Sequence, residues 1–388
     1  MLTKTTLHYL ELAITHASSI GALPYVWNSK STHPVEITTK SLRKYGIYCT
    51  YQAFVLIHLF HQFFQRFFNQ SESAIAEICL LFSVITAVCF LCLYSVNFLV
   101  KRRALMNLTN GWFSYFQKFK ADFVMPWHGR VWKNGCEREM KLVYWNTRLC
   151  PLLISFHYLQ YPYSPMYIAG YVDHISLPMY FALLPLVFTT VYVFMMSTMC
   201  FFFLFAIPAF VICSINPELK PPMGKKSIYR TKRQLRTPDN LVRLHRFFYL
   251  TTRMIEDLIS VVGIPSQYLS SYTVIACNVC LLKYTDQLGW EMASFLAIVT
   301  LVVIISYTTM LWLAAMLFRY SEGYIAAWKV YTNPWGTRHK FMEKVRRSCR
   351  PLKITLGGLY YINIKKVLAY VNFIIWGTVR TLLMVNRR

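Results

Sequence analysis

The chain has few acidic residues, few glycines and no recognisable catalytic motif. Its 388 residues include 16 Asp and Glu against 41 Lys and Arg, and only 14 are Gly. Glycine-rich phosphate loops, the GxSxG elbow of hydrolases and the HExxH motif of metalloproteases are all missing. Acidic side chains are nearly absent from the apolar segments, where proton-coupled transporters and intramembrane proteases carry their working groups. These absences argue against an enzyme or an ion-coupled pump.

Long apolar runs are what the chain has in abundance. Of its residues 56% are hydrophobic, and the mean hydropathy is +0.36. A helix needs about 20 residues to cross the hydrocarbon core of a bilayer, which is roughly 30 Å thick. Seven stretches are long enough: 46–65, 74–99, 142–161, 183–213, 258–283, 292–318 and 364–386. We therefore predict an all-α membrane protein with seven transmembrane helices.

Basic residues alternate between the connections of these segments. Residues 101–141 hold nine Lys and Arg, and residues 319–353 hold another nine. The connection between the fourth and fifth segments is similarly basic, while the other three carry almost no basic residues. Because cytoplasmic loops are enriched in Lys and Arg, we predict a cytoplasmic N-terminus, an extracellular C-terminus and cytoplasmic helical extensions. Topology and anionic lipid account for the net charge of +25, so we expect no nucleic-acid partner.

The eleven cysteines form neither a disulfide pattern nor a metal site. Cys89 with Cys92, and Cys277 with Cys280, lie inside apolar segments, where thiols pack as small apolar groups. The loops predicted outside contain no Cys, and no His or carboxylate joins these thiols. We expect no structural disulfide, no metal and no cofactor. One of the outer loops begins with a sequon at Asn69, which predicts N-glycosylation there.

Aromatic, sulfur-containing and hydroxyl side chains recur at membrane depth. They are Thr86, Phe90, Ser155, Tyr158, Tyr192, Met195, Met196, Ile304 and Tyr307. Such side chains could line a pocket for a small apolar ligand, with the hydroxyls fixing its orientation. For any single residue, ordinary helix packing or lipid exposure is the simpler interpretation.

The last apolar segment has one weakly polar face. Thr378, Leu382 and then Val385 or Asn386 share that face at spacings of three and four residues. Such a helix could line a water-filled pore, or it could make hydrogen bonds to neighbouring helices. The periodicity alone leaves both interpretations open.

A series of short motifs lies between residue 320 and the last segment. A Ser-Glu pair lies at 321–322 and an Ala-Ala pair at 326–327, followed by the aromatics Tyr331 and Trp335. A Pro-Leu step at 351–352 and a Gly-aromatic turn at 357–361 complete the series. These motifs resemble those of the insect odorant receptor family. The chain length and the inverted seven-helix topology are also similar to that family, although the motifs themselves cover only about 320–386.

The resemblance implies a tetrameric, odorant-gated, nonselective cation channel in the plasma membrane, expected on a sensory neuron dendrite. The chain would be the subunit that binds a small volatile organic ligand, working beside a common coreceptor in a heterotetramer within membrane lipid. The family's apolar gate falls on Leu382, and its outermost position falls on Asn386. Arg380 departs from the family pattern and is compatible with a cation pore only if it faces away.

The resemblance also divides the chain into four parts. Residues 1–45 would form a cytoplasmic N-terminal segment, and 46–318 a six-helix transmembrane bundle that binds the ligand and carries basic cytoplasmic loops. Residues 319–353 would form a cytoplasmic anchor, and 354–388 the pore-lining last helix with a short extracellular end.

Two alternatives stay open beside the odorant receptor. One is a gustatory-type receptor channel that forms a homomer, and the other is a membrane transporter or scaffold without channel activity. Gustatory receptors carry a Thr-Tyr…Gln-Phe pattern in the last helix. This chain has Thr378-Val379 and Val385-Asn386 instead, which favours the odorant receptor.

The predicted topology can be tested with epitope tags. A tag inserted at Lys225 should be reached by antibody only after permeabilisation, because the positive charge of that loop keeps it in the cytoplasm. A tag in the loop 161–181 serves as the control and should stain intact cells. Staining of intact cells at Lys225 would overturn the orientation.

Overall fold

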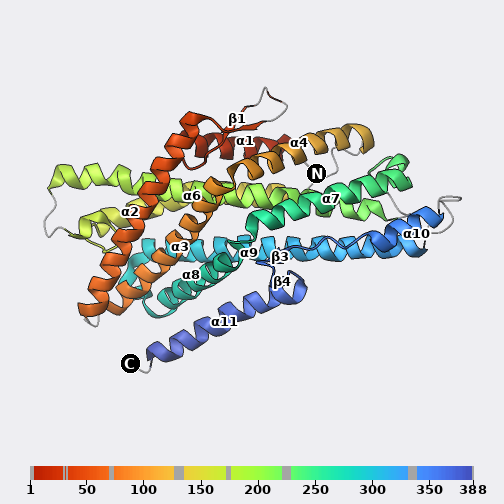
Figure 1. Ribbon diagram of the computed structural model, residues 1–388. Coiled ribbons are helices and arrows are strands. Elements are labelled where there is room, and N and C mark those ends of the chain that lie inside the picture. Colours follow the sequence, from red (N-terminus) through yellow and green to blue (C-terminus); the bar gives the residue numbers. More distant parts are fainter. Residues whose placement is uncertain are drawn as a thin grey trace.

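The computed structural model is almost entirely helical and describes residues 4–28, 31, 34–69, 74–125, 135–171, 176–220, 229–330 and 339–386. Each predicted apolar segment falls on a long helix, and these helices pack together as one bundle with α11 along its edge (Figure 1). They are α2 (Thr39–Asn69), α3 (Ala74–Val100), α5 (Gly135–Gln160), α6 (Leu177–Ile215), α8 (Gly263–Lys283), α9 (Thr285–Val330) and α11 (Ile364–Asn386). The mostly helical architecture with several long apolar helices, predicted from the sequence, is therefore present.

Not all of these helices are apolar enough to be recognised as membrane spans by composition. Among the described residues four qualify, Glu77–Val100, Leu177–Leu219, Thr285–Lys329 and Ile364–Val385, and α7 (Pro238–Ile259) with α8 makes a fifth if the bent pair is one span. The number of spans and the orientation of the termini remain predictions.

Helix α2 falls short because it carries polar side chains, and the structure explains where they go. Gln52, His58 and Gln62 are buried inside the bundle, whereas Phe64 and Phe68 on another side of the helix are exposed. A helix that faces lipid is expected to bury its polar side chains in the bundle and to expose its phenyl rings to the lipid. A low average hydropathy therefore does not exclude α2 as a span.

The N-terminal segment is a folded part of the core. Helix α1 (Lys4–Ser19) packs on α5 and α6, with Leu10 and Ile14 only 1% exposed. It is followed by the antiparallel hairpin of β1 (Val26–Trp27) and β2 (Val35–Glu36). The side chain of Asn110, in α4 (Arg102–Phe123), accepts a hydrogen bond from the Val35 amide (3.0 Å) and donates one to its carbonyl (2.8 Å). The hairpin is thereby attached to the first basic connection.

The basic connections form a second helical layer at one end of the bundle (Figure 1). It contains α4, α7, α10 (His339–Ser348), the end of α9 and the short 3-10 turns η3 (Asn216–Leu219) and η4 (Arg233–Arg236). His245 Nδ1 lies 2.6 Å from the Tyr324 hydroxyl, and Trp328 Nε1 donates to the Leu219 carbonyl (3.1 Å). Burial lowers the pKa of His245 to about 4, so the ring is neutral at cytoplasmic pH. A neutral hydrogen bond thus joins α7 to α9, and a second joins α9 to η3.

Three of the odorant-receptor-like motifs, at 321–322, 351–352 and 357–361, come together before α11, while Tyr331 and Trp335 lie outside the described residues. The Leu352 amide donates to Ser321 Oγ (2.8 Å), and the hairpin of β3 (Thr355–Leu356) and β4 (Tyr360–Tyr361) follows. Gly263, at the 63° break between α7 and α8, lies so close that an added Cβ would stand 2.6 Å from Leu356 Cδ2. The hairpin turn uses Gly357 and Gly358 at φ +56° and +71°, which other residues rarely adopt. This hairpin sets the direction in which α11 returns along the bundle.

At the opposite end, the aromatic loop after α5 packs as an ordered lid. Tyr167 is 5% exposed, and its hydroxyl lies 2.8 Å from His157 Nδ1 and donates to the Ile154 carbonyl (3.2 Å). The 3-10 turn η2 (Ile168–Tyr171) follows, and Tyr158 stacks on Tyr180 with 5.4 Å between ring centroids. This lid, residues 161–171, covers that end of the bundle.

Candidate functional site

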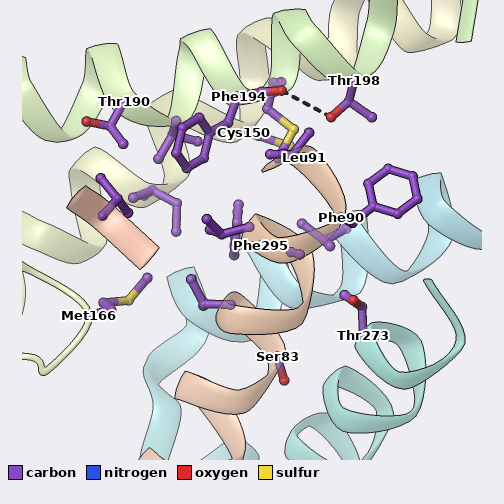
Figure 2. Close-up of a pocket in the computed structure, with 18 of the residues that line it drawn as sticks. Ser83, Phe90, Leu91, Cys150, Met166, Thr190, Phe194, Thr198, Thr273 and Phe295 are labelled. Carbon is purple, nitrogen blue, oxygen red and sulfur yellow. Dashed lines mark hydrogen bonds between the residues drawn. The ribbon is translucent and has the colours of Figure 1, made fainter. Parts of the chain in front are cut away.

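A cavity of about 250 Å³ lies beneath this lid, between α2, α3, α5, α6, α8 and α9. Its wall is almost wholly apolar, with phenyl rings such as Phe90, Phe194 and Phe295 and the sulfur atoms of Cys150 and Met166 around it (Figure 2). An apolar cavity of this kind stays dry and accepts an apolar molecule of matching size. The structure therefore contains a ready site for a small hydrophobic ligand.

Helical spacing explains why these residues share the cavity. The lining residues of α5 follow one another at intervals of three and four, at Val143, Thr147, Cys150, Ile154 and Tyr158. In α6 Thr190, Phe194 and Thr198 are four residues apart. Residues at these intervals lie on one face of an α-helix, so each helix turns a single stripe toward the cavity.

The predicted ligand-binding residues are divided by this geometry. Phe90, Tyr158, Met195 and Tyr307 lie on the cavity wall. The other five do not line the cavity. Thr86 accepts a hydrogen bond from Thr273 between α3 and α8, and Ser155 donates one to its own helix. Tyr192 stacks on Phe188, Met196 is buried in the hydrophobic core, and Ile304 packs against the edge of that core. Ser155 follows the lining residue Ile154 by one position, which is about 100° around the helix.

Sequence reasoning missed the lining residues of α2 and α8. Tyr51 of α2 and Thr273 of α8 both border the cavity. The stripe on α9, at 295, 299, 303, 306 and 310, was also overlooked apart from its neighbour Tyr307. The α9 stripe consists mostly of apolar residues in an apolar helix, so residue type gave no signal that separates its cavity side from its other sides.

Three threonine hydroxyls of the wall donate their protons to carbonyls of their own helices. Thr147, Thr190 and Thr198 donate to carbonyls of the preceding turn at 2.7, 2.7 and 3.1 Å; the Thr198 bond is dashed in Figure 2. A hydroxyl has one proton and two lone pairs. These oxygens therefore meet the cavity as hydrogen-bond acceptors, and Thr190 Oγ1 already accepts one bond from the Tyr51 hydroxyl (2.5 Å).

The predicted pore residues lie on α11, which packs along α8 and α9. Thr378 is 7% exposed, and its hydroxyl accepts a hydrogen bond from Asn278 of α8 (3.3 Å). Leu382 and Val385 are half-buried against the cluster at the lid end of the bundle, and Lys283 Nζ donates to the Val385 carbonyl (2.8 Å). Asn386 ends the helix, and its side chain lies outside the described residues, as does most of the sequon that begins at Asn69. Within one chain, Thr378 therefore faces α8 rather than open space.

The other side of α11 is a large exposed apolar face. Trp376 is 72% exposed, Leu383 61% and Val379 42%. Contiguous apolar surface of this kind marks contact with lipid or with another protein chain. At 3.6 residues per turn Arg380 lies about 160° around the helix from Leu382. The two side chains therefore belong to opposite flanks of this face.

The remaining chemistry of the bundle is sparse. Among the described residues no three His, Cys, Asp or Glu side chains are grouped so that they could hold a metal ion. The apolar cavity and the face of α11 are thus the features on which a function can be built.

The cavity itself can be tested by filling it. Ala87 borders the cavity, whereas Ala13 is fully buried in close-packed core. Ala87→Leu should leave the unfolding temperature unchanged or raise it, because the added carbons enter empty space. Ala13→Leu, the matched control, should lower the free energy of unfolding by about 1–3 kcal/mol through overpacking. Equal losses, measured by tryptophan fluorescence of the purified protein in nanodiscs, would mean that no cavity exists at Ala87.

Comparison with known proteins identifies the fold. No family model and no curated protein matches the sequence. The structure of the insect olfactory receptor OR5 from Machilis hrabei is similar, with a TM-score of 0.66 over 97% of both chains at 11% identity. The same receptor in complex with eugenol gives a TM-score of 0.61 over 98% of this chain and 99% of that one, at 13% identity. Both are receptors rather than enzymes, and the chain has the fold of an insect olfactory receptor.

Proposed function

We propose that this protein is an odorant receptor, the ligand-binding subunit of a tetrameric, odorant-gated, nonselective cation channel. The observation that carries the proposal is the apolar cavity inside a fold that matches an olfactory receptor over the whole chain. The C-terminal motifs that join α9 to α11 give independent support from the sequence.

Each segment of the chain would have its own role in the channel. Residues 46–318 would bind the odorant, 319–353 would form the cytoplasmic anchor shared between subunits, and 354–388 would line the pore and end outside. The segment 1–45 would stay on the cytoplasmic side, where it packs on α5 and α6. The exposed apolar face of α11 would be covered by neighbouring subunits and lipid, with coreceptor chains as the partners in a plasma-membrane heterotetramer.

The ligand would be a small apolar molecule with one hydroxyl donor. Apolar burial stabilises such a complex by about 25 cal/mol per Å², which for a small molecule gives micromolar affinity at best. Because the wall hydroxyls of Thr147, Thr190 and Thr198 offer acceptors, an alcohol or phenol fits better than its methyl ether. The neighbour OR5 was solved with eugenol, so eugenol is a suitable first probe.

Gating would act on the flank of α11 that carries Ile375, Val379 and Leu382. A ring of four Leu382 side chains would narrow the pore and expel water when closed. Thr378 and Val385, predicted for the same lining, would instead hold the helix to its own subunit. Arg380 would face away from the pore, which removes its conflict with permeant cations.

Ligand-evoked current tests the receptor function. Cells expressing the chain with a coreceptor should respond to eugenol, and about 3- to 10-fold more weakly to its methyl ether, since one hydrogen bond contributes about 0.5–1.5 kcal/mol. Tyr158→Ala should raise the half-maximal concentration about tenfold by removing wall contacts, and Tyr192→Ala, off the wall, should leave it nearly unchanged.

The control is expression of each chain alone. Current from this chain without a coreceptor would favour the gustatory-type homomer. No current under any condition, with the protein at the cell surface, would favour a transporter or scaffold.

Thiol accessibility tests the pore flank. A small charged thiol reagent added outside should react with Leu382→Cys, and faster when odorant is present, because opening wets the ring. Thr378→Cys is the matched control, four residues earlier but turned toward α8, and should stay protected. The wild-type chain measures the background of native cysteines. If both variants were equally protected in both states, α11 would not line the conduction path.

A further inference from the structure

Two free thiols meet between α3 and α8. Cys79 lies in α3 and Cys280 in α8, and Cys79 packs against the buried cluster that contains Cys280. The sequence offers no hint of this contact, because the two residues are 201 positions apart and neither lies in a loop.

The register of the helix pair confirms that these residues face one another. Thr273 donates a hydrogen bond to Thr86 (2.9 Å) across the same interface. Thr86 follows Cys79 by seven residues, and Thr273 precedes Cys280 by seven. Seven residues are close to two helical turns, so an antiparallel pair that brings the threonines together also brings the cysteines together. Ser83, between Cys79 and Thr86, is buried at the same interface, and its hydroxyl donates to the Cys79 carbonyl (2.8 Å).

The two thiols differ in access. Cys280 is completely buried, whereas Cys79 is half-buried and lies near the first turn of α3. Cys280 lies close to the end of α8 at Lys283. The predicted topology places both helix ends outside the cell, which is the side on which disulfides persist. Cys79 is thus the thiol that a reagent reaches first, with Cys280 behind it as the resolving thiol.

The pair lies next to the outer end of α11. Cys79, Leu382 and Val385 pack against the same cluster that contains Cys280. Lys283, one turn beyond Cys280, donates to the Val385 carbonyl (2.8 Å). A covalent bond between α3 and α8 at this level would restrain the end of α8 that holds the last turn of α11.

We propose that Cys79 and Cys280 form a site of reversible oxidation, closed by a peroxide into a disulfide between α3 and α8. The Cys79 thiol attacks one peroxide oxygen, giving a sulfenic acid and one water. The Cys280 thiol then attacks that sulfur, forming the S–S bond and releasing a second water, so that two thiols and one H₂O₂ yield one disulfide and two waters. An external thiol returns the pair to the reduced form by exchange.

The chemistry can be tested on the full-length protein in nanodiscs. After treatment with hydrogen peroxide, alkylation of the remaining thiols and digestion, mass spectrometry should find the Cys79 and Cys280 peptides joined, and separated by dithiothreitol. Cys89→Ser is the matched control, since it removes another thiol of α3 and should leave the cross-link intact. Cys79→Ser should abolish it and leave Cys280 free for alkylation under denaturing conditions. If both wild-type thiols stay alkylatable after oxidation, or if Cys79 oxidises to sulfinic acid while Cys280 stays free, the proposal is wrong.

The consequence for gating rests on the proposed function and has its own measurement. Peroxide should reduce the odorant-evoked current of the wild type and of Cys89→Ser several-fold, with recovery in dithiothreitol, and should spare Cys79→Ser. Cross-linking without any change in current would overturn the link to α11. Absence of all current would count against the channel function, while the mass-spectrometric result still decides whether the disulfide forms.

Discussion

The structure depends on one constraint, which is that polar groups inside a bilayer must find their partners within the bundle. Tyr48 reaches from α2 to Ser197 of α6 (2.9 Å), and Thr273 reaches from α8 to Thr86 of α3. Most other hydroxyls bond to carbonyls of their own helix, as Thr190 does to Leu186. The few hydrogen bonds between helices fix the register of surfaces that are otherwise apolar. The hydroxyls that donate to their own helix present their oxygens to the cavity as hydrogen-bond acceptors.

Helix α9 connects the two functional regions of the chain. Tyr307 borders the cavity, donates to the Gly263 carbonyl at the break before α8 (3.3 Å), and lies with its ring 5.0 Å from that of Tyr370 in α11. Further along the same helix, Ser321 receives the Leu352 amide just before the hairpin that starts α11. These contacts form a direct route from the cavity wall to the last helix, which the proposed odorant-gated channel would require.

Much of this architecture could be predicted from the sequence. The long helices follow from the apolar runs, and the resemblance to insect odorant receptors is borne out at the level of the fold. The site was predicted less well. Met196 and Ser155 are chemically suited to a pocket and lie beside true wall residues, Met195 and Ile154, yet they point elsewhere. In a helix that is apolar all round, as α6 is, no amphipathic pattern distinguishes the cavity side from the lipid side.

The sequence by itself determined the class of molecule, the positions of the helices and the expected orientation, because chain length, apolar runs and the distribution of basic residues respond to the membrane itself. Only the tertiary structure decided which faces meet. It turned Thr378 toward Asn278, enclosed the cavity among six helices, and brought Cys79 against Cys280. Those contacts depend on how distant helices rotate and register against one another, which is a property of their packing and not of any one segment.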